Sequence, residues 1–208
     1  MTITERRERH RQQLRQEILD AAREILVTKG YAGLSMRKVA ERIDYSPTAI
    51  YLHFADKQDL VFHLCEETFA RLVRDLEHLD TEIADPLARL REGLRRYVDF
   101  GLRNPQHYTA TFLVPHEPTA DAARLAAYTD PSSMGMRALG ILSTSLRAAI
   151  KARTIRRVDV QETTLALWSA IHGLTSLLIA MPDFPWGHRD HLIAHTITVM
   201  LDGLKRTR

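Results

Sequence analysis

Apolar side chains recur at helical spacing along nearly the whole chain. The first set consists of Leu14, Ile18, Ala22, Ile25 and Leu26. Intervals of three and four residues place these side chains on one face of an α-helix over residues 14–29. Gly30 follows as a left-handed cap that ends this helix. No alternating pattern of useful length indicates a β-strand, so the chain is predicted to be all-α.

Two short helices separated by a tight turn are predicted after Gly30. Ser35 caps the first, whose apolar positions are Met36, Val39, Ala40 and Ile43. Asp44 and Tyr45 make the turn. The second helix covers about 47–53, with Ser46 as its cap and Pro47 at its first position. With the helix that follows, this is the layout of a helix-turn-helix DNA reader.

The remaining pattern predicts further helices and two domains. Asp56 caps a long helix to about Leu79. Later helices are expected at about 84–103, 105–113, 133–153, 159–181 and 188–206, and a short one is possible at 120–128. We place a DNA-binding domain at 1–55, with a basic extension at 1–13. A larger ligand-binding and dimerisation domain is expected at 56–208.

Charge supports the DNA-reading hypothesis. Residues 1–55 contain ten Lys and Arg against seven Asp and Glu, whereas the rest of the chain is balanced at 19 of each. All the excess positive charge therefore lies with the predicted reader, as attraction to phosphates requires. A basic face that is merely solvated is the alternative.

Cysteine content and hydropathy narrow the class of protein. Cys65 is the only cysteine, so no internal disulfide forms, which fits a reducing cytosol. It lies on an apolar stripe and is expected to be a small core residue rather than a redox group. The uncharged run 163–182 is long enough for a membrane helix, but its Thr, Ser, His and Gly favour a helix inside the protein or at a subunit interface. We expect a cytoplasmic protein without a membrane anchor.

Candidate DNA contacts gather around the two short helices. Thr48, Ala49, Leu52 and His53 suit base edges, while Ser46 and Tyr51 suit phosphates. Lys57 lies in the first turn of the next helix, where the helix dipole disfavours a cation, and a phosphate partner would explain it. Ser35 and Arg37 also come within reach of DNA. Tyr51 and Phe54 have a competing interpretation as core residues, which we favour for Phe54.

This segment resembles the TetR family of bacterial transcriptional regulators over about residues 14–62. The motifs that carry the resemblance are Lys29-Gly30-Tyr31, residues 34–40 (LSMRKVA), Tyr51-Leu52-His53-Phe54 and Lys57-Gln58-Asp59-Leu60. The resemblance implies a homodimer and the DNA contacts Ser35, Arg37, Ser46, Thr48, Ala49, Tyr51, His53 and Lys57. Asp44 departs from the family, which has Gly in the turn, but Asp tolerates the left-handed conformation.

The N-terminal tail adds further positive charge. It contains Arg6, Arg7, Arg9, Arg11 and Arg15. One interpretation is an arm that reaches a minor groove or the DNA backbone. The other is a solvated, frayed extension that Glu5 and Glu8 partly neutralise.

Two motifs in the second domain resemble one class of TetR-type C-terminal domain, the Trp-His-Gly type. They are Trp168-x-x-x-His172-Gly173 and Asn104-Pro105-Gln-His-Tyr108. Trp168 and His172 share a helix face, either as a core pair or as ligand contacts. The predicted pocket is lined by Phe69, Tyr97, Phe100, Tyr108, Phe112, Met134, Trp168 and His172. These side chains suggest a hydrophobic or amphipathic small molecule.

A rival site is the face formed by His188, His191 and His195. Three imidazoles on one helix face suit zinc, but three groups in a line do not converge on a tetrahedral ion without a further partner. We therefore predict no metal, no cofactor and no enzyme activity. The expected function is a homodimeric repressor that binds a near-palindromic operator on double-stranded DNA and is released by a small-molecule effector. A dimer controlled by a partner protein, and a helical metal enzyme, remain alternatives.

Overall fold

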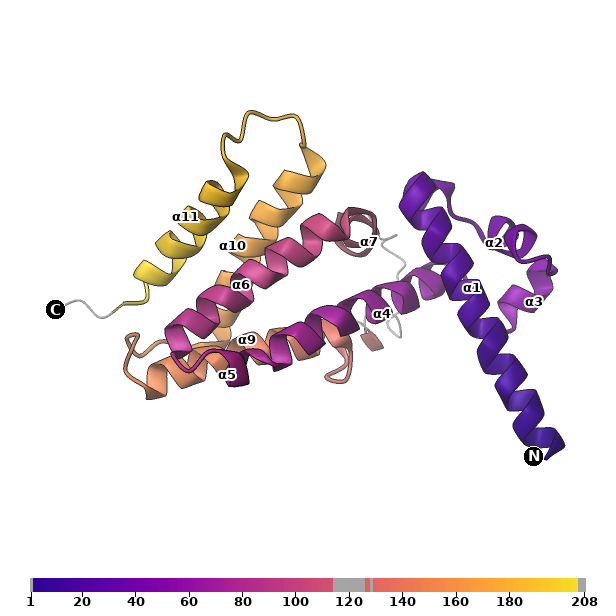
Figure 1. Cartoon of the computed structure of the whole chain (residues 1–208), viewed down its shortest axis with the longest axis horizontal. Coiled ribbons are helices and arrows are strands. Elements are labelled where there is room, and N and C mark those ends of the chain that lie inside the picture. Colours follow the sequence, from indigo (N-terminus) through magenta and orange to yellow (C-terminus); the bar gives the residue numbers. More distant parts are fainter. Residues whose placement is uncertain (1, 114–125, 128, 206–208) are drawn as a thin grey trace. The chain divides into compact units, whose positions relative to one another are not determined.

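Every regular element in the described part of the chain is a helix, which confirms the all-α prediction (Figure 1). The computed structural model describes residues 2–113, 126–127 and 129–205. These residues form two compact units, one of residues 2–68 with 106–113 and one of residues 69–105 with the described residues from 126 onward. The division falls within the helix Lys57–Glu77 (α4). The domain boundary near residue 55 stays a prediction.

The first unit contains the predicted reader. Its helices are α1 (Ile3–Gly33), α2 (Met36–Arg42), α3 (Pro47–Tyr51), the first half of α4, most of α7 (Pro105–Tyr108) and the π-helix η1 (Thr109–Leu113). α2 packs against both α1 and α3 (Figure 1). Fully buried side chains from each element, including Ile18, Val39, Ile50 and Leu60, make one small core. The reader is therefore held together by apolar burial.

α1 is much longer than the predicted helix. It begins at Ile3, because Thr2 and Glu5 form a reciprocal capping box: the Glu5 N–H donates to Thr2 Oγ1 at 3.2 Å, and the Thr2 N–H donates to Glu5 Oε2 at 2.8 Å. The interpretation of residues 3–13 as frayed is therefore wrong. Gly30 has the predicted positive φ, at 67°, and its backbone interrupts the regular helix at the predicted position, after which a short helical segment continues to Gly33.

Smaller boundary differences follow from local caps. α3 ends at Tyr51 instead of residue 53. Asp56 caps α4 as predicted, since its Oδ1 accepts from the N–H groups of Gln58 at 2.8 Å and Asp59 at 2.9 Å. α4 ends at Glu77, and a separate short helix, α5 (Leu79–Glu82), follows.

The second unit is a bundle built around α6. Its other long helices are α9, α10 and α11, and the bounds are α6 (Pro86–Arg103), α9 (Met134–Lys151), α10 (Val160–Ala180) and α11 (Arg189–Asp202). α6 packs against the other three (Figure 1). The helix considered for 120–128 lies outside the described residues, apart from 126–127.

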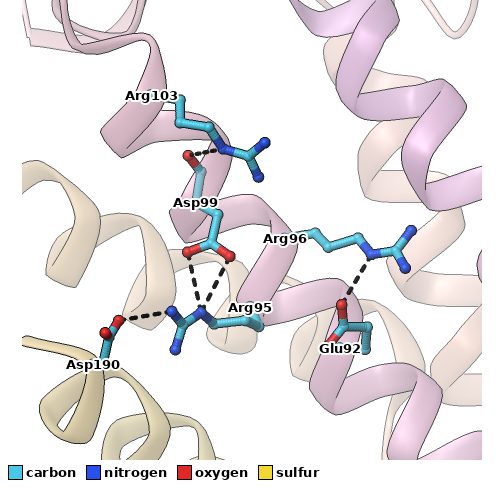
Figure 2. A network of polar contacts seen from close by, with 6 residues as sticks. All are labelled: Glu92, Arg95, Arg96, Asp99, Arg103 and Asp190. Atoms are coloured by element: carbon cyan, nitrogen blue, oxygen red, sulfur yellow. Dashed lines mark hydrogen bonds and ion pairs between the residues drawn. The ribbon is translucent and has the colours of Figure 1, made fainter.

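A polar network ties α11 to α6 (Figure 2). The Arg95 guanidinium donates to Asp99 one turn away, at 3.1 Å, and to Asp190 on α11 at 2.8 Å. Arg91 Nη1 makes a second link, to Thr198 Oγ1 at 2.7 Å. Because charge-assisted hydrogen bonds are directional, these contacts fix the register of α11 on α6.

α10 is only partly covered by its own chain. Thr164, Leu167, Ile171, Thr175 and Leu178 are buried. Leu165, Leu177 and Met181, the residue that ends the helix, are exposed. By length and composition α10 could cross a membrane, and 28% of its apolar window is buried. The exposed positions leave the subunit-interface interpretation of this segment in place.

Cys65 is a core residue, as the sequence predicted. Its thiol lies between α4 and η1, where Thr111 Oγ1 approaches Sγ at 2.5 Å. Burial raises the pKa of the thiol to about 12. A neutral, buried thiol packs as a small apolar side chain.

Candidate functional site

The start of α2 carries two of the predicted DNA contacts. Ser35 Oγ accepts the Lys38 N–H at 3.3 Å, which makes it the expected N-cap. The Arg37 side chain is 81% exposed, and its Nε donates to Glu41 Oε1 at 2.7 Å. An exposed ion pair of this kind is worth little, so the guanidinium can exchange Glu41 for a phosphate or a base edge at small cost.

The turn between α2 and α3 depends on a left-handed residue. Asp44 has φ of 57°, the conformation that the sequence required of it. The Tyr45 N–H then donates to Ala40 O at 3.0 Å and closes the turn. Asp44 therefore takes the backbone role for which glycine is the usual residue.

α3 packs against the core on one side and is exposed to solvent on the other. Ser46 Oγ accepts the Ala49 N–H at 3.3 Å, and Pro47 occupies the first turn, as predicted. Ile50 and Phe54 are buried, which confirms the core interpretation of Phe54. Tyr51 is 54% exposed. This one-turn helix is thus fixed by two core side chains while its other face meets solvent.

The remaining candidates on and after α3 differ in exposure. Thr48 is exposed, whereas Ala49 and His53 are half-buried. Burial, followed by the charges of Arg11 and Arg15, lowers the pKa of His53. His53 is therefore neutral at pH 7 and presents one donor and one acceptor.

Lys57 has a partner inside the protein. Its Nζ donates to Tyr31 O at 2.7 Å and lies 3.7 Å from the centroid of the Tyr31 ring. Burial, followed by the charge of Lys38, lowers the pKa of Lys57. The Tyr31 carbonyl and ring therefore already account for this cation within the protein, without a phosphate. A DNA contact by Lys57 stays a prediction.

All eight candidate DNA contacts belong to the first unit: seven lie on α2, α3 or directly beside them, and Lys57 is the first residue of α4. Sequence reasoning missed that Arg11 and Arg15 lie close to the end of α3. The Arg15 guanidinium lies 4.9 Å from the centroid of the Phe54 ring. Arg7, Arg11 and Arg15 recur every four residues, and this spacing indicates that they share one face of a helix.

The eight predicted pocket residues divide between the two units. Tyr108 and Phe112 belong to the first, where their ring centroids are 5.0 Å apart. The second holds Phe69, Tyr97, Phe100, Met134, Trp168 and His172. Within the second unit the Phe69 and Phe100 rings are 5.0 Å apart. A single pocket lined by all eight stays a prediction.

His172 is the polar centre of the candidates in the second unit. Its Nδ1 hydrogen-bonds with Tyr97 Oη at 3.1 Å, and its ring lies 5.4 Å from that of Trp168. Burial lowers the pKa of His172, so the imidazole is neutral at pH 7. Tyr97 is buried, whereas Trp168 and His172 are half-buried. The pair therefore contributes to the core and retains a partly accessible edge.

The histidine face on α11 has little support as a metal site. The His188 and His191 rings are 5.3 Å apart and help to line an open pocket with Leu102 and Ile193. Among the described residues, no three His, Cys, Asp or Glu side chains are placed to hold one metal ion.

Two family models match the chain. Residues 18–64 match the model for bacterial regulatory proteins of the tetR family. Residues 90–202 match a tetracyclin repressor-like C-terminal domain. Together these models cover more than half of the chain, including the helix-turn-helix and the α6–α11 bundle. The narrower Trp-His-Gly class stays a prediction.

Curated relatives are named as transcriptional regulators. The repressor AcnR of Corynebacterium diphtheriae is 41% identical over 58 residues, which are 28% of this chain and 30% of the relative. The activator FasR of Mycolicibacterium smegmatis is 28% identical over 102 residues, 49% of this chain and 47% of the relative. The chain thus spans less than half the length of these two. AcnR of Corynebacterium efficiens is 28% identical over 79% of this chain and 81% of the relative.

Solved structures share the fold over nearly the whole chain. A protein of unknown function from Rhodococcus sp. RHA1 has a TM-score of 0.76 and 25% identity, with 93% of this chain and 96% of that chain covered. The regulator FadR from Bacillus subtilis, solved in complex with stearoyl-CoA, has a TM-score of 0.74 and 19% identity, with coverage of 91% and 98%. At that identity, the likeness to FadR concerns the fold.

Proposed function

The chain belongs to the TetR family of DNA-binding transcriptional regulators, and we propose that it is a homodimeric repressor released from its operator by a small amphipathic molecule. One observation carries the DNA half of this proposal: α3 is anchored by Ile50 and Phe54 while Tyr51 and Thr48 remain exposed. A short, rigid helix of this kind suits a major groove. Its place of action is the cytoplasm, where bacterial DNA lies.

We assign roles to the eight candidate contacts by their chemistry. Arg37, Thr48, Ala49 and His53 are proposed to meet base edges. The hydroxyls of Ser35, Ser46 and Tyr51 are proposed to bind phosphate oxygens, which position the reader without reading sequence. Lys57 would add charge attraction only if it exchanges its contact with Tyr31 O for a phosphate.

The exposed apolar positions of the last two helices support the proposed dimer. Leu177 on α10 is 47% exposed, and Val199 on α11 is 58% exposed. Leu177 and Val199 thus add apolar surface to two helices that are in contact in the second unit, and Leu165 is also exposed, about 120° from Leu177 around α10. A second copy would cover this surface symmetrically. Two reading helices about 34–36 Å apart would then face successive major grooves of a near-palindromic operator.

We place the effector among the aromatic residues of the second unit. Tyr97, Trp168 and His172 combine apolar rings with a neutral hydrogen-bonding group, which suits an amphipathic ligand. FadR, which shares the fold, was solved with stearoyl-CoA, so long-chain acyl-CoA thioesters are the first probes to try. Release requires only that the ligand bind the DNA-incompetent conformer more tightly than the DNA-competent one.

Capture of genomic DNA tests the proposal. Fragments retained by the purified full chain are sequenced, and the shared site is synthesised as a duplex for affinity measurements. Tyr51→Phe should weaken binding to all sequences alike, since it removes a phosphate contact. Arg37→Ala should instead relax the preference for the captured site.

Two results would count against the proposal. Unchanged operator affinity and preference in both variants would refute the assignment of the reading residues. Failure of acyl-CoA thioesters and of a broad metabolite set to release DNA would favour the alternative, a dimer controlled by a partner protein.

A further inference from the structure

The first 11 residues of α1, Ile3–Gln13, extend beyond the apolar core as an ordered, exposed helix. The buried side chains of α1 begin only at Leu14. At 1.5 Å per residue the extension is about 16 Å long. Since the Thr2–Glu5 capping box satisfies its first N–H groups, the extension is a preformed helix and not a flexible arm.

One face of α1 changes from apolar to basic where the core ends. Between Ile18 and Leu26 this face is buried in the first unit. Toward the N-terminus the same face carries Arg15, Arg11 and Arg7, which fall within an arc of about 80° because they are spaced four residues apart. Packing in the core does not explain these arginines, because both Arg7 and Arg11 are exposed.

Two contacts show which way this basic face is directed. The Arg15 guanidinium lies over the ring of Phe54, the residue that anchors the end of α3. Next along the face, the charge of Arg11 acts on the His53 imidazole together with that of Arg15. Both arginines therefore lie on the side of α1 where the reading helix ends.

The acidic residues of the extension neutralise this face only in part. Glu5 is engaged in the capping box. Glu8 lies 3.9 Å from Arg11, and both side chains are more than half exposed. An exposed pair at that distance contributes little and is readily replaced by a phosphate.

We propose that Arg7 and Arg11 bind backbone phosphates of the operator just beyond the base pairs read by α3. This extends the proposed function and rests on it. The partner is the same DNA duplex, chosen by charge complementarity between a preformed basic helix face and a polyanion. The contacts carry no base readout, so they add affinity and salt dependence but not sequence preference.

A matched pair of double variants tests this assignment in the full chain. Arg7→Gln/Arg11→Gln removes two charges from the basic face. Arg6→Gln/Arg9→Gln removes two charges from the same helix at positions about 100–160° from Arg7 and Arg11 around its axis. Glutamine retains helix propensity, and circular dichroism checks that both variants keep the helicity of the wild type.

Affinity for the captured operator is measured between 50 and 300 mM salt. Each lost phosphate contact should reduce the slope of log affinity against log salt by about 0.9. A dimer that loses four contacts should therefore show a slope smaller by about 3 to 4, and at least tenfold weaker binding at 50 mM salt. The control should change the slope by less than 1, and site preference should be kept in both variants.

Shortening the DNA provides a second arm. About five base pairs are removed from each end of the operator duplex, which corresponds to the roughly 16 Å reach of the extension. This should lower the DNA affinity of the wild type and leave the affinity of Arg7→Gln/Arg11→Gln unchanged. Equal slopes for the two double variants would overturn the inference while leaving the operator-binding proposal intact. If the wild type captures no operator, the proposed function itself fails.

Discussion

The two units of this protein differ in how far their functional residues are determined locally. In the first unit, the candidate DNA contacts lie on two helix caps, on or just after the short helices α2 and α3, and in the first turn of α4, all within residues 35–57. In the second unit, a polar pair among the candidates, Tyr97 and His172, joins α6 to α10 across 75 residues. Because duplex DNA has one repeating geometry, a local motif suffices to read it, whereas a ligand site depends on how distant helices pack.

The largest effect expected in the first unit is loss of the anchor beneath α3. Phe54→Ala removes a ring that is 1% exposed, and it should lower the free energy of unfolding by about 3–5 kcal/mol. Leu52→Ala, at an 80% exposed position two residues earlier, should cost less than about 0.5 kcal/mol. Urea unfolding compares the two. Similar losses in both variants would mean that α3 is not fixed by its buried side.

In the second unit, the corresponding effect should be on assembly. Leu177→Asp places an unpaired carboxylate on the exposed apolar surface of α10, and it should weaken the proposed dimer about a hundredfold or more. Gln161→Asp, also exposed on α10 and about 160° away around the helix, is the matched control. Sedimentation at several concentrations measures both. If Leu177→Asp dimerises as tightly as the wild type, α10 is not in the interface, and a wild type that stays monomeric at all concentrations would refute the dimer itself.

A smaller effect on stability is expected from substitutions of Asp44 in the turn between α2 and α3. Asp44→Ala should destabilise the chain by about 1 kcal/mol, because alanine at a φ of 57° lacks the local hydrogen bonding that helps Asp to adopt this conformation. Asp44→Gly should be neutral or slightly stabilising in thermal unfolding, since glycine adopts positive φ without penalty. The reverse order of stabilities would contradict the backbone role assigned to Asp44.

The smallest expected effect is on the pH dependence of stability, through His172 in the second unit. Burial lowers the pKa of His172, so the folded state binds fewer protons there than the unfolded state. Its contribution to stability is complete above the usual pKa of 6.5 and declines as the pH falls below that value. Urea midpoints at pH 7.5 and 5.5 should therefore differ slightly more for the wild type than for His172→Gln. Identical pH dependence would mean that the imidazole titrates as freely in the folded chain as in the unfolded one.

Local signals in the sequence predicted most of the fold, including the caps and the turn that carry the candidate DNA contacts. Ser35, Ser46 and Asp56 cap helices where short-range rules require a cap, and Gly30 has positive φ as expected. The Thr2-x-x-Glu5 pattern is typical of a capping box and indicates the start of α1, although the run of arginines favoured a frayed tail.

Contacts between distant segments were not predictable in this way. Lys57 binds the Tyr31 carbonyl, 26 residues earlier in the chain, and no spacing rule links the two. Similarly, α10 reads as a uniformly apolar helix, yet only part of it is covered by α6 and α9. Which face stays open depends on where the other helices lie, and that information is tertiary.

The state of Cys65 makes the protein convenient to label. It is the only cysteine, it is buried, and its thiol pKa of about 12 leaves almost no thiolate at neutral pH. A maleimide would therefore react at a newly introduced cysteine and leave the native thiol untouched. Leu52→Cys, at the exposed end of the reading helix, would carry one spin label or dye per chain. Distances between two such labels would report the separation of the reading helices directly, with and without effector.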